Sequence, residues 1–495
     1  MAVKKAENKK KMRKGFIILV MLLAFWNAQA LASHSSHRIV IYGKAQLAAE
    51  INHILQAYQN ADIGVYVKSM KYGDTLYAQN INHPFVPASI LKILTAETAL
   101  LYLGPEYRFS TQLVTDAKSV NNGVLDGNLY LVHSGDPSLT YYDLISLMNS
   151  LKSQQISSVT GNVYVDDTAF DQSYGAPGWM AKDARFCYGA PISAGIVNHN
   201  CLPFRIVPGH KSGQLAQIMT SPRYYYPALQ NTVMTKPRHS RGCYLKLGSS
   251  QSALSLEGCM PKGHYAWGVS YVVENVLSYN VSLVKNLFHR YGVRVLGHVT
   301  PGKAQSTLAQ VGDHRSQPLR VIVNDMMKKS DNVIAGALFK KLGQVYTRQP
   351  GSWENGGHAV ERILSEKIGI NTSGMRLIDG SGLSRYNQIS PLQMMQVLDF
   401  AYHHVGTNYE FISALPIAGI DGTLKHRMYN IARKVRAKTG TMAGAGVVSL
   451  AGYAIGGNKE PIAFVIMING RRGSGWTYKE LEDKIATLLT EYQRS

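Results

Sequence analysis

The stretch Ser89-Ile90-Leu91-Lys92 lies at the start of a dense apolar segment, residues 88–103, that follows Pro87 and ends at Gly104-Pro105. A proline at the beginning and a Gly-Pro pair at the end are typical start and stop signals of a helix. The segment is apolar nearly all round, which predicts that this helix is buried. Residues three apart share a helix face, so we expect the Lys92 amine to lie beside the Ser89 hydroxyl.

A serine hydroxyl paired with a lysine amine points to nucleophilic catalysis. The hydroxyl is a poor nucleophile until a base removes its proton, and Lys92 can be that base only if its pKa is lowered. An apolar helix supplies the burial that lowers it, and the helix N-terminus offers the Ser89 backbone N–H to a developing negative charge. Alone the pattern is weak, because an ordinary helix start with a capping serine has the same residues.

Two further motifs follow in the chain. Ser330-Asp331-Asn332 lies between two predicted helices, residues 318–329 and 332–342, where a side chain can point into a cleft. Lys438-Thr439-Gly440 opens a strand-like C-terminal segment, in which Gly440 allows close approach to the backbone and its two neighbours can bind a carboxylate. The three motifs in this order are the signature of class A β-lactamases and penicillin-binding proteins.

The chain resembles one group in particular, the class C low-molecular-mass penicillin-binding proteins of the D-alanyl-D-alanine carboxypeptidase/endopeptidase family. The long separation of Lys92 from Ser330 resembles this family, in which extra domains are inserted between the first two motifs. A class A β-lactamase would have a much shorter gap. Further matching stretches are Gly127-Asn128-Leu129-Tyr130-Leu131, Gly135-Asp136-Pro137, Pro177-Gly178-Trp179, Tyr188-Gly189-Ala190-Pro191, Asp379-Gly380-Ser381-Gly382-Leu383-Ser384-Arg385 and Gly422-Thr423-Leu424.

The resemblance implies an α/β (α+β) domain of the serine β-lactamase/transpeptidase type, with an antiparallel sheet flanked by helices. Residues 33–105 and 315–495 would form this catalytic domain, and residues 106–314 would form an inserted, mostly β region of one or two lobes. The residue patterns agree with this division. Short strand-like runs separated by Gly, Pro, Asn and Ser recur throughout the insertion.

The outer parts of the chain have their own patterns. Residues 61–70 and 75–79 alternate apolar and polar side chains around Gly73-Asp74, which predicts a hairpin. Residues 358–367 and 391–403 are typical of helices. The C-terminal part predicts strands at residues 444–454 and 462–468 and a final helix at residues 479–492.

The resemblance also implies a mechanism. Ser89 attacks the D-Ala-D-Ala carbonyl, Lys92 takes its proton, and the backbone N–H groups of Ser89 and Thr441 form the oxyanion hole. β-Lactams would mimic this substrate and acylate the same serine. The other residues expected in the cleft are Ser330, Asn332, Lys438, Thr439 and Gly440.

Two residues resemble positions that line the substrate region of the family. Arg385 could bind a carboxylate bidentately and Asp183 could contact an amine, although a surface salt bridge is the alternative for each. Met442-Ala443 is apolar where the family pattern suggests a polar side chain, which leaves substrate preference open. We expect no metal and no cofactor.

The N-terminus has the pattern of a secretory signal peptide over residues 1–32. A lysine-rich leader precedes an apolar run at residues 15–26, and Ala28-Gln29-Ala30 and Ala30-Leu31-Ala32 are small-residue cleavage candidates. The apolar run is short for a membrane anchor, which is the alternative. We therefore expect a periplasmic protein.

The formal net charge is +21, and the chain remains strongly basic without its leader. Export argues against a nucleic-acid partner and leaves peptidoglycan or an anionic membrane surface, so peripheral membrane association stays open, as does the oligomeric state. The four cysteines, an even number in an exported chain, predict two disulfides. Local pairing, 187–201 and 243–259, is favoured among the three connectivities, and a zinc site is disfavoured because Cys-x-x-Cys spacing is missing.

Two other functions compete with the carboxypeptidase. A serine β-lactamase would need rapid deacylation, and no persuasive general-base glutamate follows Ser330-Asp331-Asn332. A non-catalytic peptidoglycan-binding or β-lactam-sensing protein on the same fold is the second rival, and the three intact motifs argue against it.

Overall fold

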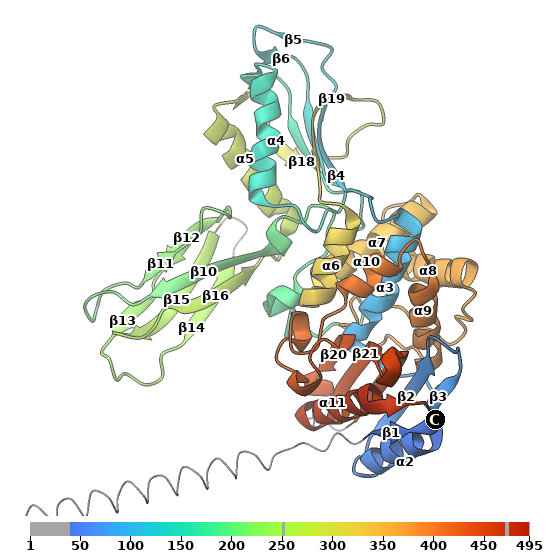
Figure 1. Cartoon of the computed structure of the whole chain (residues 1–495). Helices are drawn as coiled ribbons and strands as arrows, with labels where there is room; N and C mark the ends of the chain where they lie inside the picture. The colour runs from blue at the N-terminus through green and yellow to red at the C-terminus, as the bar shows by residue number, and fades with distance from the viewer. Residues whose placement is uncertain (1–39, 250–252, 471–474, 495) are drawn as a thin grey trace, which may run out of the picture.

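The computed structural model describes residues 40–249, 253–470 and 475–494, so the predicted signal peptide at residues 1–32 lies outside the described residues. Figure 1 shows a main body from which two lobes project. Both ends of the described chain lie in the main body, and the middle of the chain forms the lobes. Over the described ranges, none of the helices combines the length and apolar character that crossing a bilayer requires.

An antiparallel five-stranded sheet forms the centre of the main body, with the strand order β20-β21-β22-β2-β3. The central strand β22 and its neighbour β21 are buried along nearly their whole length, which explains their continuous apolar sequences. The predicted hairpin is confirmed as two adjacent antiparallel strands. The bounds are β2 (Asp62–Ser69), β3 (Thr75–Gln79), β20 (Val435–Met442), β21 (Val447–Ile455) and β22 (Pro461–Asn469).

Helices cover both faces of this sheet. Successive residues of β22 show the two layers, because Val465 packs into one core cluster and Ile466 into the other. The cluster of Ile466 is closed by α2 (Gly43–Gln56) and α11 (Gly475–Glu491), while the short β1 (Ile41–Tyr42) pairs with β23 (Tyr492–Gln493). The other face carries α3 (Lys92–Leu103), α6 (Leu319–Lys329), α7 (Asn332–Thr347), α8 (Trp353–Ile363), α9 (Pro391–His403) and α10 (Asn408–Ala414).

The predicted helix over residues 88–103 is buried, as expected, but its first turn is different. Ala88–Leu91 form a 3-10 turn and the α-helix begins at Lys92. Other boundaries also differ from prediction, and two of them have a clear local cause. Helix α8 begins at Trp353 because Ser352 caps it by accepting a hydrogen bond from the Asn355 N–H. Strand β21 begins at Val447, three residues later than expected, because a 3-10 turn precedes it.

The first lobe contains two sheets and two helices around a core of its own. The larger sheet has the order β18-β9-β7-β4-β19 and the smaller β17-β8-β6-β5. Helices α4 (Tyr141–Ser153) and α5 (Val276–Tyr291) pack on them. The strands are β4 (Ser110–Thr115), β5 (Val120–Asn121), β6 (Val124–Leu125), β7 (Leu129–Val132), β8 (Ser158–Val159), β9 (Val163–Asp166), β17 (Arg294–Val295), β18 (Val299–Pro301) and β19 (Ala309–Arg315).

The second lobe is all β and has a small apolar core that includes Phe204, Ile206 and Leu256. Cys243 and Cys259 form a disulfide in it, with Cα atoms 4.9 Å apart, and Cys187 and Cys201 form a second at its base. The predicted local pairing is therefore confirmed. The strands are β10 (Cys201–Val207), β11 (Gln217–Met219), β12 (Ala228–Asn231), β13 (Met234–Lys236), β14 (Leu245–Ser249), β15 (Ala253–Pro261) and β16 (Trp267–Val272).

Residues 167–200, here called the connecting segment, join β9 to β10 and lie against the main body. The buried side chain of Lys340 on α7 donates to Asp171 Oδ1 at 2.6 Å and to the Ser173 carbonyl at 2.7 Å. The indole N–H of Trp179 donates to Asp379 Oδ2 at 2.6 Å. Part of the insertion is thus fastened to the catalytic helices.

We predict that Asp171→Asn lowers the free energy of unfolding by about 1–3 kcal/mol, because the buried Lys340 ammonium loses its charged acceptor. Thermal or urea unfolding measures this. The matched control is Asp325→Asn, which removes the exposed ion pair with Lys329 and should cost less than about 0.5 kcal/mol. Equal losses in the two variants would contradict the prediction.

Candidate active site

The turn that carries Ser89 is held in an unusual backbone conformation. Ala88 has a φ of 49°, in the left-handed region that residues other than glycine rarely adopt. Its neighbours force this geometry. A side chain at Gly382, which itself has a φ of 79°, would overlap the Ala88 carbonyl oxygen, and one at Gly440 would overlap Ser449 Oγ and lie 3.1 Å from Ala88 Cβ. The turn therefore packs directly against β20 and the loop at Gly382.

Packing gives a further reason for glycine in the third motif, besides the expected approach of a substrate to the backbone. Ser449 and the turn that carries the nucleophile both come close to Gly440. Ser449 Oγ donates to the Pro87 carbonyl at 2.6 Å and fixes that turn from the next strand.

Lys92 is fully buried, and its amine has three hydrogen-bond partners. It lies 3.0 Å from Ser89 Oγ, 2.7 Å from Asn332 Oδ1 and 2.7 Å from the Ser381 carbonyl oxygen. The last two can only accept. A neutral amine has two N–H donors and one lone pair, so the two acceptors take both hydrogens and the lone pair remains for the Ser89 O–H.

Burial lowers the pKa of Lys92 to about 7, and it outweighs the opposite effect of the negative charges on Asp379 and Asp331. A substantial fraction of the amine is therefore unprotonated at neutral pH. Lys92 can act as a base only if its pKa is lowered, and its burial meets this condition.

The second motif lies where two helices meet. Ser330 ends α6 with a left-handed φ of 56°, and Asp331 caps α7 by accepting the Ile334 N–H at 2.9 Å. Asn332 is the first residue of α7. Its Nδ2 donates to the Tyr188 carbonyl at 2.9 Å, a contact from the connecting segment that sequence reasoning did not identify.

The third motif lies on β20, a strand at the edge of the central sheet. The fully buried Lys438 donates to Ser330 Oγ and to the Thr439 carbonyl, both at 2.8 Å. Burial, and then the positive charge of Lys92, hold the pKa of Lys438 well below its usual value. Thr439 Oγ1 donates to Thr423 Oγ1 at 2.7 Å, in one of the stretches that carried the family resemblance.

Two hollows meet at Ser89, Ser330 and Thr441, which line both of them. The larger, of about 390 Å³, here called the first hollow, is also lined by Lys182, Asp183, Tyr188, Asn332, Arg385 and Met442. The smaller, of about 280 Å³, here called the second hollow, is also lined by Thr423, Arg427, Thr439 and Lys479. The predicted site residues therefore gather around one serine.

Arg385 and Asp183, for which surface salt bridges were the alternative, both line the first hollow. Asp183 has 9% of its surface exposed, and its carboxylate accepts the Tyr188 hydroxyl at 2.9 Å. Lys182 is a neighbour that the sequence did not single out, and Tyr188 is one that belongs to a stretch resembling the family but was given no role.

Asp379 organises the loop next to the nucleophile, a role that we did not predict. It is fully buried and accepts the backbone N–H groups of Gly382 at 2.7 Å, Ser384 at 2.8 Å and Ser381 at 3.0 Å. These bonds place the Ser381 carbonyl against Lys92. The signal was available in Asp379-Gly380-Ser381-Gly382, a stretch that resembled the family without an assigned role.

Within the described residues, no group of three or more His, Cys, Asp or Glu side chains is arranged to hold a metal ion.

Comparison with known proteins agrees with this geometry. The model of the D-Ala-D-Ala carboxypeptidase 3 (S13) family matches residues 45–492. The chain belongs to this family. It is 30% identical over 443 residues to the D-alanyl-D-alanine carboxypeptidase DacB of Haemophilus influenzae, covering 88% of this chain and 90% of that protein. It is 31% identical to the D-alanyl-D-alanine carboxypeptidase of Actinomadura sp. (strain R39), covering 94% and 87%.

The crystal structure of penicillin binding protein 4 from Haemophilus influenzae is also similar. It has a TM-score of 0.74 and 30% sequence identity, over 85% of this chain and 93% of that one. The expected fold, an α/β (α+β) domain of the serine β-lactamase/transpeptidase type with helices flanking its antiparallel sheet, is thus confirmed, and so is the resemblance to the D-alanyl-D-alanine carboxypeptidases.

Proposed function

We propose that this S13 protein is a serine-type D-Ala-D-Ala carboxypeptidase that acts on peptidoglycan stem peptides through an acyl-enzyme on Ser89. The observation that carries the proposal is the Lys92 amine, buried, with a pKa of about 7, and 3.0 Å from Ser89 Oγ. Its other two bonds leave the lone pair for the serine proton.

In the proposed reaction, Lys92 Nζ takes the Ser89 proton as Oγ forms a bond to the penultimate D-Ala carbonyl carbon. The resulting oxyanion would be stabilised by the backbone N–H groups of Ser89 and Thr441, two residues that line both hollows. The C–N bond then breaks, and the leaving D-Ala amine receives the proton that Lys92 took from Ser89. Water next attacks the ester carbonyl and gives a proton to Lys92, the bond from the acyl carbon to Oγ breaks, and Lys92 returns the proton to Ser89 Oγ.

The second hollow suits the leaving group. Thr439 lines this hollow and would bind the terminal carboxylate, and the fully buried Lys438 would act on it through Ser330, which accepts a hydrogen bond from Lys438 and would carry a proton to the cleft. A bound carboxylate favours the charged form of Lys438. That charge disfavours a second charge on Lys92, so substrate binding would keep the base unprotonated.

The first hollow suits the peptide that stays on the enzyme. Arg385 and Lys182 offer positive charge, and Asp183 offers a carboxylate held by Tyr188. A side chain ending in an amine and a carboxylate, as in diaminopimelate, complements this set. Met442 also lines the hollow and adds an apolar wall.

Endopeptidase cleavage of D-Ala–diaminopimelate cross-links is a second candidate activity. The second hollow extends past Thr439 to Arg427 and Lys479, beyond the position of a terminal carboxylate. Mass spectrometry of muropeptides incubated with the protein, with and without penicillin, identifies the bond that is cut. Cleavage of dimers as well as release of D-Ala supports this candidate.

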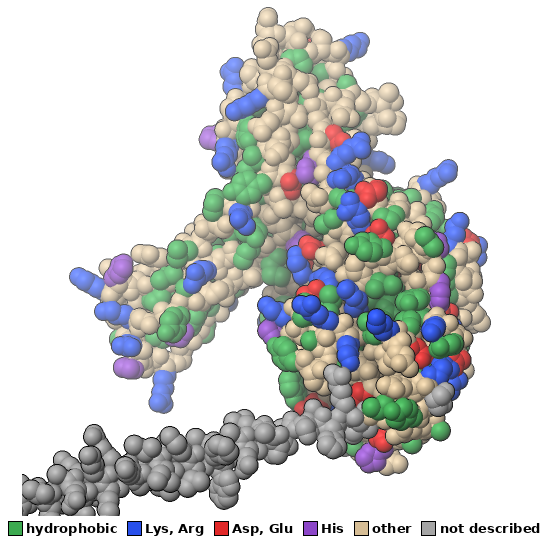
Figure 2. Space-filling model, viewed as in Figure 1, with side chains coloured by type: hydrophobic (Ala, Val, Ile, Leu, Met, Phe, Trp, Pro, Cys, Tyr) green, Lys and Arg blue, Asp and Glu red, His purple; other side chains and the backbone are tan. Residues whose placement is uncertain are grey.

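Periplasmic location is part of the proposal. The leader at residues 1–32 and two disulfides are expected of an exported chain. Lys and Arg side chains are spread over the main body and both lobes in Figure 2. This distribution suits long-range attraction to an acidic polymer such as the cell wall, or to an anionic membrane face.

We predict that Ser89→Ala abolishes both covalent labelling by fluorescent penicillin and release of D-Ala from a pentapeptide. Gel fluorescence and amino-acid analysis measure these. The control is Ser365→Ala, an exposed serine on the main body, which should behave as wild type. Label that persists in Ser89→Ala would end the mechanism. Rapid turnover of nitrocefin by the wild type would instead favour a β-lactamase.

We predict that the acylation rate rises with pH, because only the unprotonated amine of Lys92 can accept the serine proton. The rate should increase about tenfold per pH unit below 7 and level off above about pH 8. Labelling kinetics from pH 5.5 to 9 measure the midpoint. Glu97→Gln is the control, because burial raises the pKa of Glu97 to about 7 on the same helix, and this variant should keep the midpoint. A midpoint that moves with Glu97 would contradict the assignment.

We predict that Arg385→Ala lowers kcat/KM for a diaminopimelate-containing stem peptide on the order of 10- to 100-fold, because one charged hydrogen-bonding partner is lost. A lysine-containing stem lacks that carboxylate and should change less than about threefold. Asp183→Asn should weaken both substrates, since both carry the amine. The surface variant Arg362→Ala is the control. Equal losses on the two stems in Arg385→Ala would contradict the assigned contact.

A further inference from the structure

The orientation of the Asn332 amide is set by the connecting segment. Its two ends differ chemically, because Oδ1 accepts and Nδ2 donates. The Tyr188 carbonyl, 2.9 Å from Nδ2, can only accept, so it selects the orientation in which Oδ1 faces the Lys92 amine at 2.7 Å. Nδ2 keeps its second hydrogen for the first hollow, which Asn332 lines.

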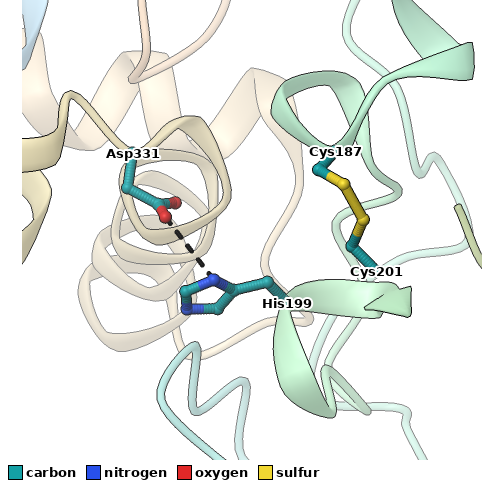
Figure 3. Close-up of a disulfide and its surroundings, with 4 residues drawn as sticks. All are labelled: Cys187, His199, Cys201 and Asp331. Carbon is teal, nitrogen blue, oxygen red and sulfur yellow. Dashed lines mark ion pairs between the residues drawn. A yellow bond between two sulfur atoms is a disulfide. The ribbon is translucent and has the colours of Figure 1, made fainter. Parts of the chain in front are cut away.

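Tyr188 is placed by a disulfide. Cys187 precedes it directly and is bonded to Cys201 across 14 residues, with Cα atoms 5.5 Å apart. Figure 3 shows this disulfide beside the N-terminal turn of α7, with His199 and Asp331 nearby. The loop closed by the bond, here called the clamp loop (residues 187–201), therefore approaches the second motif from one side.

The other end of the clamp loop also contacts the second motif. Residues 198–200 have three consecutive left-handed φ values of 49°, 55° and 51°, which side chains other than glycine seldom adopt in succession. Such a turn persists only where its surroundings hold it. Asn200 is fully buried and donates its Nδ2 to the Pro191 carbonyl at 2.9 Å. The turn directs His199 Nδ1 to within 3.5 Å of Asp331 Oδ2 (Figure 3).

Asp331 has two functions at this point. Oδ1 caps α7 by accepting the Ile334 N–H, and Oδ2 is the oxygen that His199 contacts. The clamp loop contacts Asp331 and Asn332, which are adjacent in the chain. Its disulfide joins Cys187, directly before Tyr188, to Cys201, two residues after His199.

We propose that the clamp loop is a positioning element of the active site: the Cys187–Cys201 disulfide holds the Tyr188 carbonyl and the His199 side chain so that Asn332 presents Oδ1 to Lys92. This inference rests on the proposed roles of Lys92 and Asn332 in acylation. It adds His199 and the backbone of Tyr188 as positioning groups that act through the second motif. It also makes full activity depend on oxidation of this one cysteine pair.

The second disulfide provides a matched control. Cys243 and Cys259 close a loop of similar length, with a sequence separation of 16, in the second lobe next to β14. Neither cysteine lines either hollow. Removal of this bond changes the cysteine chemistry and the loop entropy by similar amounts without touching the clamp loop.

The test compares Cys187→Ser/Cys201→Ser with Cys243→Ser/Cys259→Ser and the wild type, using fluorescent penicillin. Two quantities are measured, the acylation rate constant and the final amount of label per molecule. A positioning role predicts a rate lowered on the order of 10- to 100-fold in the first pair with full final labelling, since an amide displaced by about 1 Å has this effect. The second pair should label at the wild-type rate.

His199 tests the same idea without altering a disulfide. His199→Ala should slow acylation by at most about fivefold, because a partly exposed ion pair contributes little. His199→Gln, which retains an N–H donor for Asp331, should recover the wild-type rate. Thermal unfolding of both variants shows that each is folded.

The outcomes distinguish a failure of the proposed function from a failure of the clamp proposal. A wild type that Ser89-directed penicillin does not label would overturn the proposed function. A labelled wild type whose rate is unchanged in both the Cys187/Cys201 pair and His199→Ala overturns the clamp alone. The clamp proposal is also overturned if Cys187→Ser/Cys201→Ser gives less final label but each active molecule reacts at the wild-type rate. That result would mean that part of the protein is unfolded, and not that Asn332 is misplaced.

Discussion

Burial of two lysine amines in one small space is the constraint on which the site depends. Lys92 and Lys438 are both fully buried, and each disfavours a positive charge on the other. Desolvating one ammonium already costs several kcal/mol, and two like charges add repulsion. The low-energy state therefore contains an unprotonated amine. For Lys92, the acceptors Asn332 Oδ1 and the Ser381 carbonyl take the N–H groups and leave the lone pair for Ser89.

The rest of the fold maintains this burial. Helix α3 runs through the main body with every residue from Lys92 to Leu100 buried, so water cannot solvate the amine from the helix side. The glycines at 382 and 440 let a loop and a strand pack on the nucleophile's turn where any side chain would collide. Asp379 then binds the backbone of its own loop and holds the Ser381 carbonyl in place. This loop thus brings an acceptor to the fully buried Lys92.

The insertion makes direct contacts with the main body and contributes residues to the first hollow. Its two lobes have cores of their own, but the connecting segment leaves them, accepts a hydrogen bond from Lys340 on α7 and donates one from Trp179 to Asp379. It contributes Asp183 and Tyr188 to the first hollow and a carbonyl to Asn332. The residues proposed here for specificity and positioning thus lie in the region that the predicted division at residues 106–314 assigns to the insertion.

Local sequence determined the elements and the identity of the reacting groups. Residues 88–103 are apolar nearly all round, which predicts a buried helix, and the spacing of Ser89 and Lys92 puts hydroxyl and amine on one face. The sequence also allowed prediction of the hairpin at β2 and β3, of the disulfide pairs and of the carboxypeptidase family. Turn residues, cysteine spacing and the order of motifs can all be read along the chain.

Tertiary structure alone decided the rest. The 3-10 geometry of the first turn follows from packing against Gly382 and Gly440, which are hundreds of residues away in the chain. The contacts of Asn332 with Tyr188 and of Asp331 with His199 join segments more than 130 residues apart. No local pattern specifies such pairs, because a backbone carbonyl is the same in every residue and only the folded chain places it.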